Sequence, residues 1–182
     1  GQMFCEVRSL ETVTISEGVE IIDIQAFAYN PNLRTINIPN SVMSLGAGIV
    51  HGCPKLEQIT GKYTSDDGRC LITDGILNSF APANLTEYTL PKDVTIIGSM
   101  AFSDNFTELK TVHLPEGLVT IADRAFRYSG LETITFPSTL KYLYAEAFYG
   151  SNALKNIYCK SLFPPAFVGC DDRWETVFGD IH

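Results

Sequence analysis

The chain has 182 residues, a formal net charge of −8 and 45% apolar residues. This length predicts a single domain, and this share of apolar residues is typical of a folded chain. The acidic balance argues against nucleic acid as a partner, because phosphate binding requires clustered Lys and Arg. No run of residues is apolar enough to span a membrane, and the first residues lack the basic and apolar regions of a signal peptide.

A segment of 22 to 24 residues recurs along the chain. Each copy contains an Ala-Phe pair or a weaker equivalent, and the second residue of that pair serves as its marker: Phe27, Val50, Phe102, Phe126 and Phe148. The markers are separated by 23, 52, 24 and 22 residues. A Leu follows each marker by five to seven residues, and Ile or Val follows that Leu by three. Single steps of this size are typical of leucine-rich repeats, and such copies must stack because one copy cannot bury its own apolar face.

Each copy is expected to contain two short strands joined by turns. In the segment 33–38 the residues alternate, so that Ile36 and Ile38 face the core while their neighbours face outward. The following Pro39 cannot donate an N–H group and ends this first strand. A second apolar run, such as 94–97, predicts another strand on the opposite side. The Ala-Phe segment predicts one turn of α- or 3₁₀-helix.

A small residue with a hydrogen-bonding side chain stands three positions after each marker: Asn30, Cys53, Asn105, Ser129 and Ser151. We expect these side chains to bond to backbone groups of the turn, which would otherwise be left without partners.

Residues 61–86 interrupt the repeats and account for the doubled step. Asp67-Gly68 and Asp74-Gly75 are turn signals, and Asp-Gly between two apolar runs predicts a β-hairpin over residues 70–80. Residues 62–64 are a candidate third strand. The insert could close off one half of the solenoid or project as a contact surface. Its apolar residues need covering, which favours the structural role.

The ends depart from the repeat, as terminal repeats are expected to do. Residues 1–11 are expected to add a strand that covers the first repeat. Beyond residue 160 the pattern is lost, and Trp174, Val177 and Phe178 are expected to fold back as a cap, unless the last residues fray. The predicted organisation is one domain with an N-terminal cap (1–11), repeats (12–60), an inserted hairpin (61–86), repeats (87–159) and a C-terminal cap (160–182).

The repeated pattern I-P-x-x-V-x-x-I-x-x-x-A-F-x-x-(C/N/S)-x-x-L-x-x-I-x-I covers about residues 12 to 159. It resembles the BspA-type leucine-rich repeat family, although the Ala-Phe pair is Ile49-Val50 in the second copy. The resemblance implies a right-handed leucine-rich repeat solenoid of the α/β horseshoe class, mainly β with short helical turns, and with a parallel sheet on its concave face. Members occur on surface and secreted proteins of anaerobic gut and oral bacteria and of some protozoa. The resemblance therefore implies an extracellular or outer cell surface location and binding to other proteins or host surfaces.

No constellation of catalytic residues is recognisable in the sequence. The three histidines are not at metal-ligand spacing, and the HExxH and GxSxG motifs are absent. Asp171, Asp172 and Glu175 do not match the spacing of an EF-hand loop and are expected to form a solvated acidic loop. We expect no enzyme, no cofactor and no metal site.

The five cysteines indicate neither a disulfide framework nor a zinc site, because their number is odd and no CxxC occurs. We expect buried free thiols that act as small apolar residues. Cys159 and Cys170 are the one pair whose position suggests a possible bond.

The remaining candidate site is the outward side of the first strand of each copy. Alternation places on this predicted concave face Thr35, Asn37, Gln58, Thr60, Glu87, Thr89, Thr111, His113, Thr133, Thr135, Asn156 and Tyr158. The face is neutral apart from Glu87 and suits hydrogen bonding to a protein or a surface glycan. Alternatively, these residues only suit an exposed strand. Phe80, Phe106, Tyr128 and Tyr149 are candidates for an edge contact or for core packing.

These features favour a monomeric, non-enzymatic extracellular module for protein interaction or adhesion. The alternative is a structural spacer or targeting segment of a larger surface protein whose activity lies elsewhere.

Overall fold

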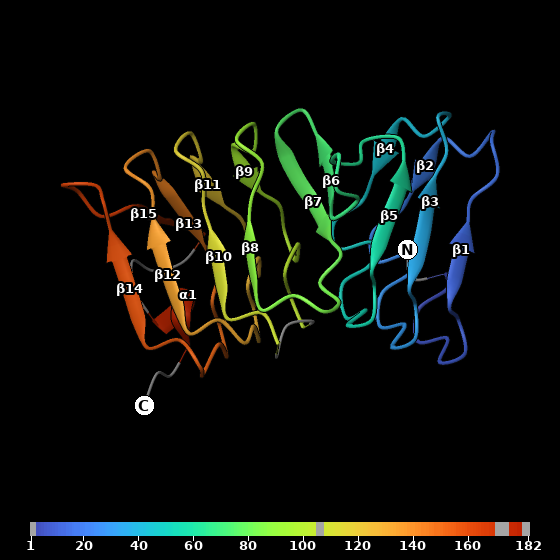
Figure 1. The fold of residues 1–182 in the computed structure, drawn as a ribbon. Coiled ribbons are helices and arrows are strands. Elements are labelled where there is room, and N and C mark those ends of the chain that lie inside the picture. The colour runs from blue at the N-terminus through green and yellow to red at the C-terminus, as the bar shows by residue number, and fades with distance from the viewer. Residues whose placement is uncertain (1–2, 105–107, 170–174, 180–182) are drawn as a thin grey trace.

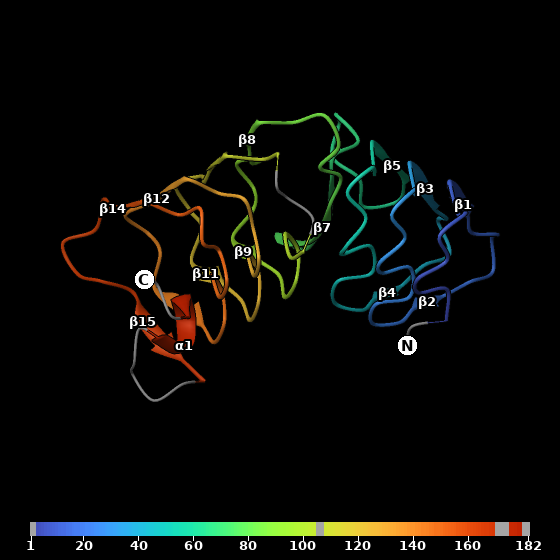
Figure 2. The same cartoon turned by 90° about the horizontal axis from the view of Figure 1, so that it is seen from below.

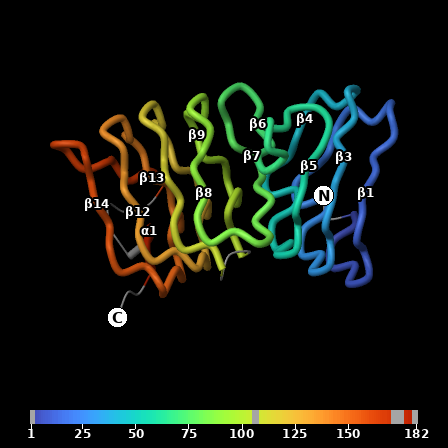
Figure 3. Tube along the Cα trace, viewed as in Figure 1, coloured from blue at the N-terminus to red at the C-terminus, as the bar shows by residue number. Residues whose placement is uncertain are grey.

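The fold is a parallel β-solenoid built from two rows of short strands (Figures 1 and 3). It is seen in a computed structural model that describes residues 3–104, 108–169 and 175–179. The first row contains β1 (Thr12–Thr14), β3 (Thr35–Ile38), β5 (Gln58–Gly61), β8 (Glu87–Thr89), β10 (Thr111–His113), β12 (Thr133–Phe136) and β14 (Asn156–Cys159). The second row contains β2 (Ile21–Ile22), β4 (Ser44–Leu45), β6 (Cys70–Thr73), β7 (Ile76–Phe80), β9 (Ile96–Ile97), β11 (Thr120–Ile121), β13 (Tyr142–Tyr144) and β15 (Ala166–Val168).

The strands pair with the equivalent strands of neighbouring copies, as the repeat pattern predicts. Val13, Ile36 and Ile59 stand in register in the first row of the N-terminal half, and all three are buried. Pro39 directly follows the end of β3, as expected for a residue that cannot donate to the ladder. The predicted two-row repeat is therefore confirmed over the residues described.

A stack of aromatic rings forms the centre of the core. The rings of Phe102 and Phe126 lie 4.8 Å apart at 14°, and those of Phe126 and Phe148 lie 5.1 Å apart at 6°. Phe178 extends this stack by packing on Phe148 at 5.5 Å. A separate stacked pair, Phe4 and Phe27, lies at the N-terminal end at the same ring distance, and Phe27 belongs to the N-terminal core. Sequence reasoning missed Phe4, although it precedes Phe27 by the repeat length, and placed Phe178 in the C-terminal cap without identifying it as a member of the ring stack.

The Ala-Phe segments are turns but not the helical turns expected from the sequence. In the copy around Phe126, the residues two before and two after the marker, Arg124 and Tyr128, have φ values of 56° and 51°. Such left-handed residues break a helix. They also turn the N–H group of Phe126 toward the next copy, where it donates to the carbonyl of Ala147 at 2.7 Å. The turns therefore form a third hydrogen-bonded row. Among the described residues the only helix is α1 (Glu175–Phe178).

Three of the side chains three residues after the markers bond to turn backbone groups, as predicted, whereas Ser129 Oγ lies 3.0 Å from Ser151 Oγ. Asn30 donates to the carbonyl of Phe27 at 2.8 Å, and Ser151 Oγ donates to the carbonyl of Phe126 at 2.7 Å. Cys53 Sγ lies 3.3 Å from the Phe27 carbonyl. Asn105 lies outside the described residues.

The inserted hairpin exists and joins the two halves of the solenoid. β6 and β7 pair antiparallel around a turn in which Asp74 and Gly75 both have positive φ, and β7 also pairs with β9. Leu71 packs in the N-terminal core, whereas Leu77 packs in the C-terminal core. The expected third strand at 62–64 is reduced to an isolated bridge between Thr64 and Leu71. The hairpin is thus a wall shared by two cores.

Both ends form incomplete copies of the repeat. Residues 3–11 form turns rather than the expected strand, and the Phe4 and Glu6 N–H groups bond to the carbonyls of Ala26 and Ala28. At the other end, Val177 is buried and accepts from the Phe148 N–H group at 2.8 Å, so α1 occupies the place of the next turn. The predicted folding back of Val177 and Phe178 is confirmed, whereas Trp174 lies outside the described residues.

The solenoid is arched (Figure 2). The first-row strands β1, β3, β5, β8, β12 and β14 follow the outer outline of the arch, and the second-row strands β2, β4, β7, β9, β11 and β15 follow its inner outline. A parallel sheet lines the inner side of the arch, as expected, but it is formed by the second row. The first row, which carries the predicted contact residues and was expected on the concave face, lies on the outer side. The two halves meet at the inserted hairpin, where the first row is interrupted between β5 and β8. The repeat pattern is the same on both sides of this joint between the halves, so the sequence pattern does not predict the direction of the bend.

Replacing Phe126 by Ala should lower the free energy of unfolding by about 3–5 kcal/mol, because it opens a cavity in the middle of the ring stack. Urea denaturation followed by circular dichroism measures this loss. Replacing the exposed Phe163 by Ala is the matched control and should change stability by less than about 0.5 kcal/mol. Equal losses for the two variants would contradict the role of the stack.

Candidate interaction surface

The first-row face is the outward side of the first-row strands, and all twelve predicted contact residues lie on it. On β3, β5, β10 and β12 they alternate with buried core residues. On β8 the residue between them, Tyr88, is half-buried, and on the edge strand β14 all four residues are exposed. Thr35 stands beside Gln58, and Asn37 stands beside Thr60. In the C-terminal half, one column contains Glu87, Thr111, Thr133 and Asn156. The other strand positions contain Thr89 beside His113, and Thr135 beside Tyr158.

The first-row face also contains Thr12 and Thr14, which sequence reasoning missed. Both are exposed on β1, in register with Thr35 and Asn37. The signal was present, because Thr12-Val13-Thr14 alternates and Thr12 precedes Thr35 by 23 residues. They were missed because residues 12–14 were not aligned with the first strands of the later copies.

Several side chains on the first-row face are hydrogen-bonded to one another between copies. Asn37 Nδ2 donates to Thr60 Oγ1 at 3.0 Å, and Thr35 Oγ1 lies 3.3 Å from Thr12 Oγ1. His113 Nε2 lies 2.7 Å from Glu87 Oε1, with both side chains largely exposed. Bonds of this kind fix side-chain rotamers before any partner arrives, which lowers the entropic cost of binding.

A polar cavity of about 690 Å³ lies where the inserted hairpin meets the first-row face of the C-terminal half. Its wall includes Thr89 of the first-row face, the ring of Tyr88, and Gly75 of the hairpin turn. It also includes Tyr63, Thr64, Ser65, Asp66, Asp67, Ile72, Asp74, Pro91 and Asp93. The four carboxyl groups give the cavity a negative potential, which favours basic rather than acidic side chains of a partner.

Asp67 and Tyr88 hold the wall of this cavity together. The Tyr88 hydroxyl donates to Asp67 Oδ2 at 2.7 Å and lies 3.4 Å from Cys70 Sγ. Partial burial disfavours the charged form of Asp67, but hydrogen bonds from Ser65, Tyr88 and the Arg69 N–H group outweigh it and lower the pKa of this carboxyl. Burial, together with Cys70 and Asp67, raises the pKa of Tyr88. Tyr88 therefore remains a neutral donor at physiological pH.

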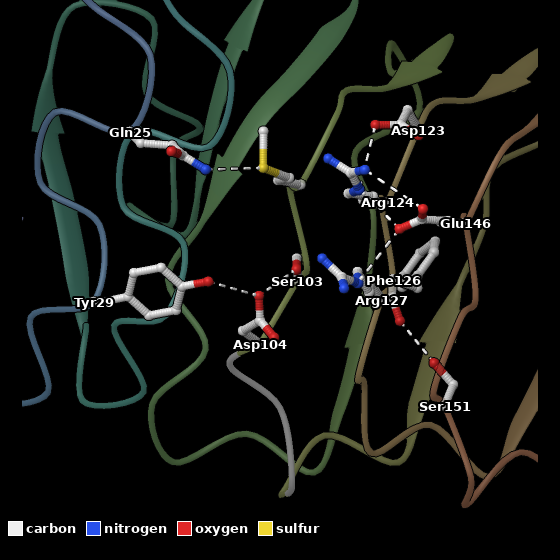
Figure 4. A network of polar contacts seen from close by, with 11 residues as sticks. Gln25, Tyr29, Ser103, Asp104, Asp123, Arg124, Phe126, Arg127, Glu146 and Ser151 are labelled. Carbon is white, nitrogen blue, oxygen red and sulfur yellow. Dashed lines mark hydrogen bonds and ion pairs between the residues drawn. The ribbon is translucent and has the colours of Figure 1, made fainter. Parts of the chain in front are cut away.

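The turn row presents a second polar surface, shown in Figure 4. Tyr29 of the N-terminal half donates to Asp104 of the C-terminal half at 3.3 Å, and Ser103 Oγ donates to the same carboxylate oxygen at 2.8 Å. Arg124 Nε lies 2.8 Å from Glu146 Oε2, and this hydrogen bond lowers the pKa of Glu146. Of these contacts, the bond between Tyr29 and Asp104 connects the two halves across the joint.

The predicted edge residues divide between core and surface. Phe80 is buried against Phe102 at a ring distance of 4.8 Å and is a core residue. Tyr128 and Tyr149 are partly exposed, and the guanidinium of Arg127 lies 4.8 Å from the Tyr128 ring. Phe106 lies outside the described residues.

The cysteines do not form a reactive or metal-binding centre in the part of the chain that is described. Cys53 and Cys70 are buried as predicted, and burial raises the pKa of both thiols to about 12. Cys5 is partly exposed and Cys159 is exposed, which departs from the expectation of buried thiols. Cys170, the possible partner of Cys159, lies outside the described residues, as do Asp171 and Asp172. Within the described ranges, no group of three His, Cys, Asp or Glu side chains could hold a metal ion.

The family model of the BspA type leucine rich repeat region matches residues 1–66 and 77–170, in six copies. The unmatched stretch between these ranges contains β6, so the family pattern and the structure interrupt the repeats at the same place. No curated protein is similar enough in sequence to count as a relative.

Solved structures show the same fold. A leucine-rich repeat protein from Eubacterium ventriosum has a TM-score of 0.64 and 24% identity, over 82% of this chain and 42% of that one. A leucine rich cell surface protein from Faecalibacterium prausnitzii has a TM-score of 0.53 and 23% identity, over 86% and 49%. The leucine rich repeat protein TpLRR of T. pallidum has a TM-score of 0.54 and 22% identity, over 87% and 73%. The chain thus spans less than half the length of the first two proteins.

The described part of the chain contains no helix that is long and apolar enough to cross a membrane.

Replacing Tyr88 by Phe should destabilise the protein more at neutral pH than at acidic pH. Because the folded-state pKa of Asp67 is lowered, its ionised form contributes stability above the unfolded pKa of about 3.9, and this contribution is lost as the pH falls through the folded pKa. Removing the Tyr88 hydroxyl removes one bond to the charged form, at a cost of about 1 kcal/mol at pH 7. Urea midpoints at neutral pH and below the pKa of Asp67 measure the difference.

The control is Tyr158→Phe, because Tyr158 is exposed and its hydroxyl has no hydrogen-bond partner among the described residues. This variant should show no such pH dependence. A deficit of Tyr88→Phe that is the same at both pH values would contradict the coupling to Asp67.

Proposed function

Because the chain belongs to the BspA-type leucine-rich repeat family, we propose that it is a non-enzymatic protein-interaction module that acts in adhesion outside the cell. A repeat solenoid supplies a rigid scaffold, and its function lies in the side chains that it displays. The proposal therefore relies on a displayed surface rather than on a reaction centre.

The proposed contact surface is the first-row face. The observation that carries this proposal is the ordered array of hydrogen-bonding side chains, neutral apart from Glu87, with two outward positions per strand along a parallel sheet. A partner with hydrogen-bonding groups at strand spacing could contact several copies at once. The first-row strands follow the outer outline of the arch in Figure 2, which supports contact with a large partner.

The proposed partner is a protein on another cell or in its surroundings. The neutral face suits the polar groups of a protein surface, and the acidic cavity beside Thr89 suits a basic side chain at its edge. The extracellular location is supported by the names of two of the solved relatives. One of them is a cell surface protein of Faecalibacterium prausnitzii, and another, at 21% identity, a TM-score of 0.50 and over 87% of this chain and 53% of that one, is the pneumococcal vaccine antigen PcpA.

The proposal can be tested with beads that carry the purified protein and are applied to monolayers of epithelial cells. The double variant Thr111→Lys and Thr133→Lys places two charges in the middle of the first-row face and should reduce the number of bound beads by about tenfold or more, because buried unpaired charges oppose binding. The control Thr120→Lys places the same side chain on the outward position of the second-row strand β11 and should bind as the unchanged protein does.

Unchanged binding of the double variant would refute the first-row face as the contact surface. If the unchanged protein itself fails to bind, adhesion is refuted and the spacer role is favoured. Loss of binding after enzymatic removal of cell-surface glycans, with surface proteins left intact, would show that the partner is a glycan.

A further inference from the structure

The first row of strands has a gap inside the molecule, between β5 and β8 (Figure 1). β5 is the last strand of one sheet and β8 is the last strand of the other, so both are edge strands. The edge of β5 is covered in part, because the Ile59 N–H group donates to the carbonyl of Gly68 at 2.8 Å. Among the described strands, β8 pairs with β10 alone. A free strand edge therefore lies in the interior of the chain.

The free backbone groups of β8 are those of Glu87 and Thr89. The carbonyl of Thr86 and the N–H group of Leu90 both bond to β10, at 3.2 Å and 3.1 Å. Because successive residues of a strand direct their backbone groups to opposite sides, the N–H and C=O groups of Glu87 and Thr89 face the gap. An edge of this kind can take up an extended segment of another chain as a further strand.

The polar cavity of about 690 Å³ lies against this edge, because Tyr88 and Thr89 belong to its wall. Its other walls are the loop of residues 63–67, the turn of the inserted hairpin and the segment that follows β8. The Tyr88 hydroxyl reaches from β8 to Asp67 in that loop at 2.7 Å. The cavity therefore occupies the place beside β8 that an added strand would enter.

Four carboxyl groups line this cavity, those of Asp66, Asp67, Asp74 and Asp93. None of them has an ion-pair partner within the parts of the chain that are described. Like charges that are gathered without a cation repel one another, so a positively charged occupant is favoured over a neutral one.

The two basic residues of the insert bond elsewhere. Lys62 Nζ donates to the carbonyl of Val42. Arg69 Nη1 donates to the carbonyls of Ala81 and Ala83, at 3.1 Å and 3.0 Å. The cations nearest in sequence to these carboxyl groups are thus held by backbone carbonyls, and a cation of another molecule is needed to neutralise the cavity.

The wall of the cavity also contains a hydroxyl group without a partner. Thr64 lines the cavity, and its Oγ1 atom is buried with no hydrogen-bond partner among the described residues. A buried hydroxyl in this state lowers stability, and a ligand that supplies a hydrogen bond would relieve the loss.

We propose that the gap between β5 and β8 binds an extended segment of a partner protein in which every second side chain is Lys or Arg. This inference rests on the proposed role in protein binding, but it assigns the contact to the gap rather than to the first-row face. The segment pairs with the free groups of Glu87 and Thr89 and continues the first row of the C-terminal half. Because successive side chains of a strand point to opposite faces, its basic side chains all enter the cavity, toward Asp74 and Asp93.

The probe that tests the proposal is a short synthetic peptide of alternating Lys and Thr, labelled with a fluorophore and blocked at both ends. Its binding to the full chain is followed by fluorescence anisotropy. The Lys-Thr peptide should bind, and the same peptide with Glu in place of Lys should not. Two N-methylated versions, one methylated at every Lys and one at every Thr, keep all charges. The version whose methyl groups face β8 should bind at least about tenfold more weakly, because it cannot donate to the strand edge.

The double variant Asp74→Asn and Asp93→Asn should weaken binding of the Lys-Thr peptide about tenfold or more, because it removes two charges from the cavity. Asn keeps the size of Asp and tolerates the positive φ of residue 74. The control Glu20→Gln and Glu108→Gln removes the same charge from exposed residues outside the cavity wall and should bind the peptide normally. Circular dichroism confirms that both variants are folded.

Three results would overturn the proposal. The first is a Lys-Thr peptide that does not bind. The second is equal binding of the unmodified peptide and both N-methylated versions, because it would indicate attraction of charges without strand pairing. The third is a folded variant with Asn at both positions that binds as tightly as the unchanged protein.

The adhesion of beads described above separates this inference from the proposed function. If the beads adhere to cells but the peptide does not bind, only the assignment of the gap fails. If the peptide binds as expected but the beads do not adhere, the role in adhesion fails and the assignment of the gap stands.

Discussion

The structure depends on the stacking of each Ala-Phe turn on the turn of the next copy. The aromatic ring of the marker fills the core, while its N–H group bonds to the neighbouring turn, as Phe126 does with Phe148 and Ala147. Left-handed residues on both sides of the marker make the second contact possible by directing that N–H group along the solenoid. Each copy is therefore stable only because its neighbours are present, which is the property that defines repeat proteins.

The inserted hairpin interrupts this arrangement without leaving either half uncovered. Its alternating side chains enter different cores, with Leu71 on the N-terminal side and Leu77 on the C-terminal side. Backbone bonds fix it to both halves, from Ile59 to Gly68 at 2.8 Å and from Gly98 to Leu77 at 2.9 Å. The hairpin thereby creates both the bend and the polar cavity beside the first-row face. The sequence left open that the insert projects as a contact surface. Its apolar residues are instead buried in two cores.

Much of the fold could be predicted because each copy of the repeat can be compared with the other copies of the same chain. The spacing of Phe102, Phe126 and Phe148 fixed the register of the strands and therefore the outward position of Thr111 and His113. Phe4 was missed, and Phe178 was not identified as a member of the ring stack, because no Ala precedes either residue, so the pair that served as a signal was absent. The direction of the bend and the bond between Tyr88 and Asp67 depend on how the hairpin packs against both halves. Packing of this kind has no counterpart in the spacing of a repeat, and neither does the left-handed conformation of Arg124.

The central claim is that the hairpin is a shared wall between two stacks of neighbour-dependent copies. Hydrogen exchange of the native protein, followed at individual amides, tests it most directly, because protection reports the free energy of local opening. The account predicts the strongest protection at the amides of the hairpin and its adjacent copies, such as Leu77 and Gly98, and a decline toward Phe4 and Phe148. A hairpin whose amides exchange faster than those of the flanking copies would contradict the claim, because it would show that the two stacks are stable without it.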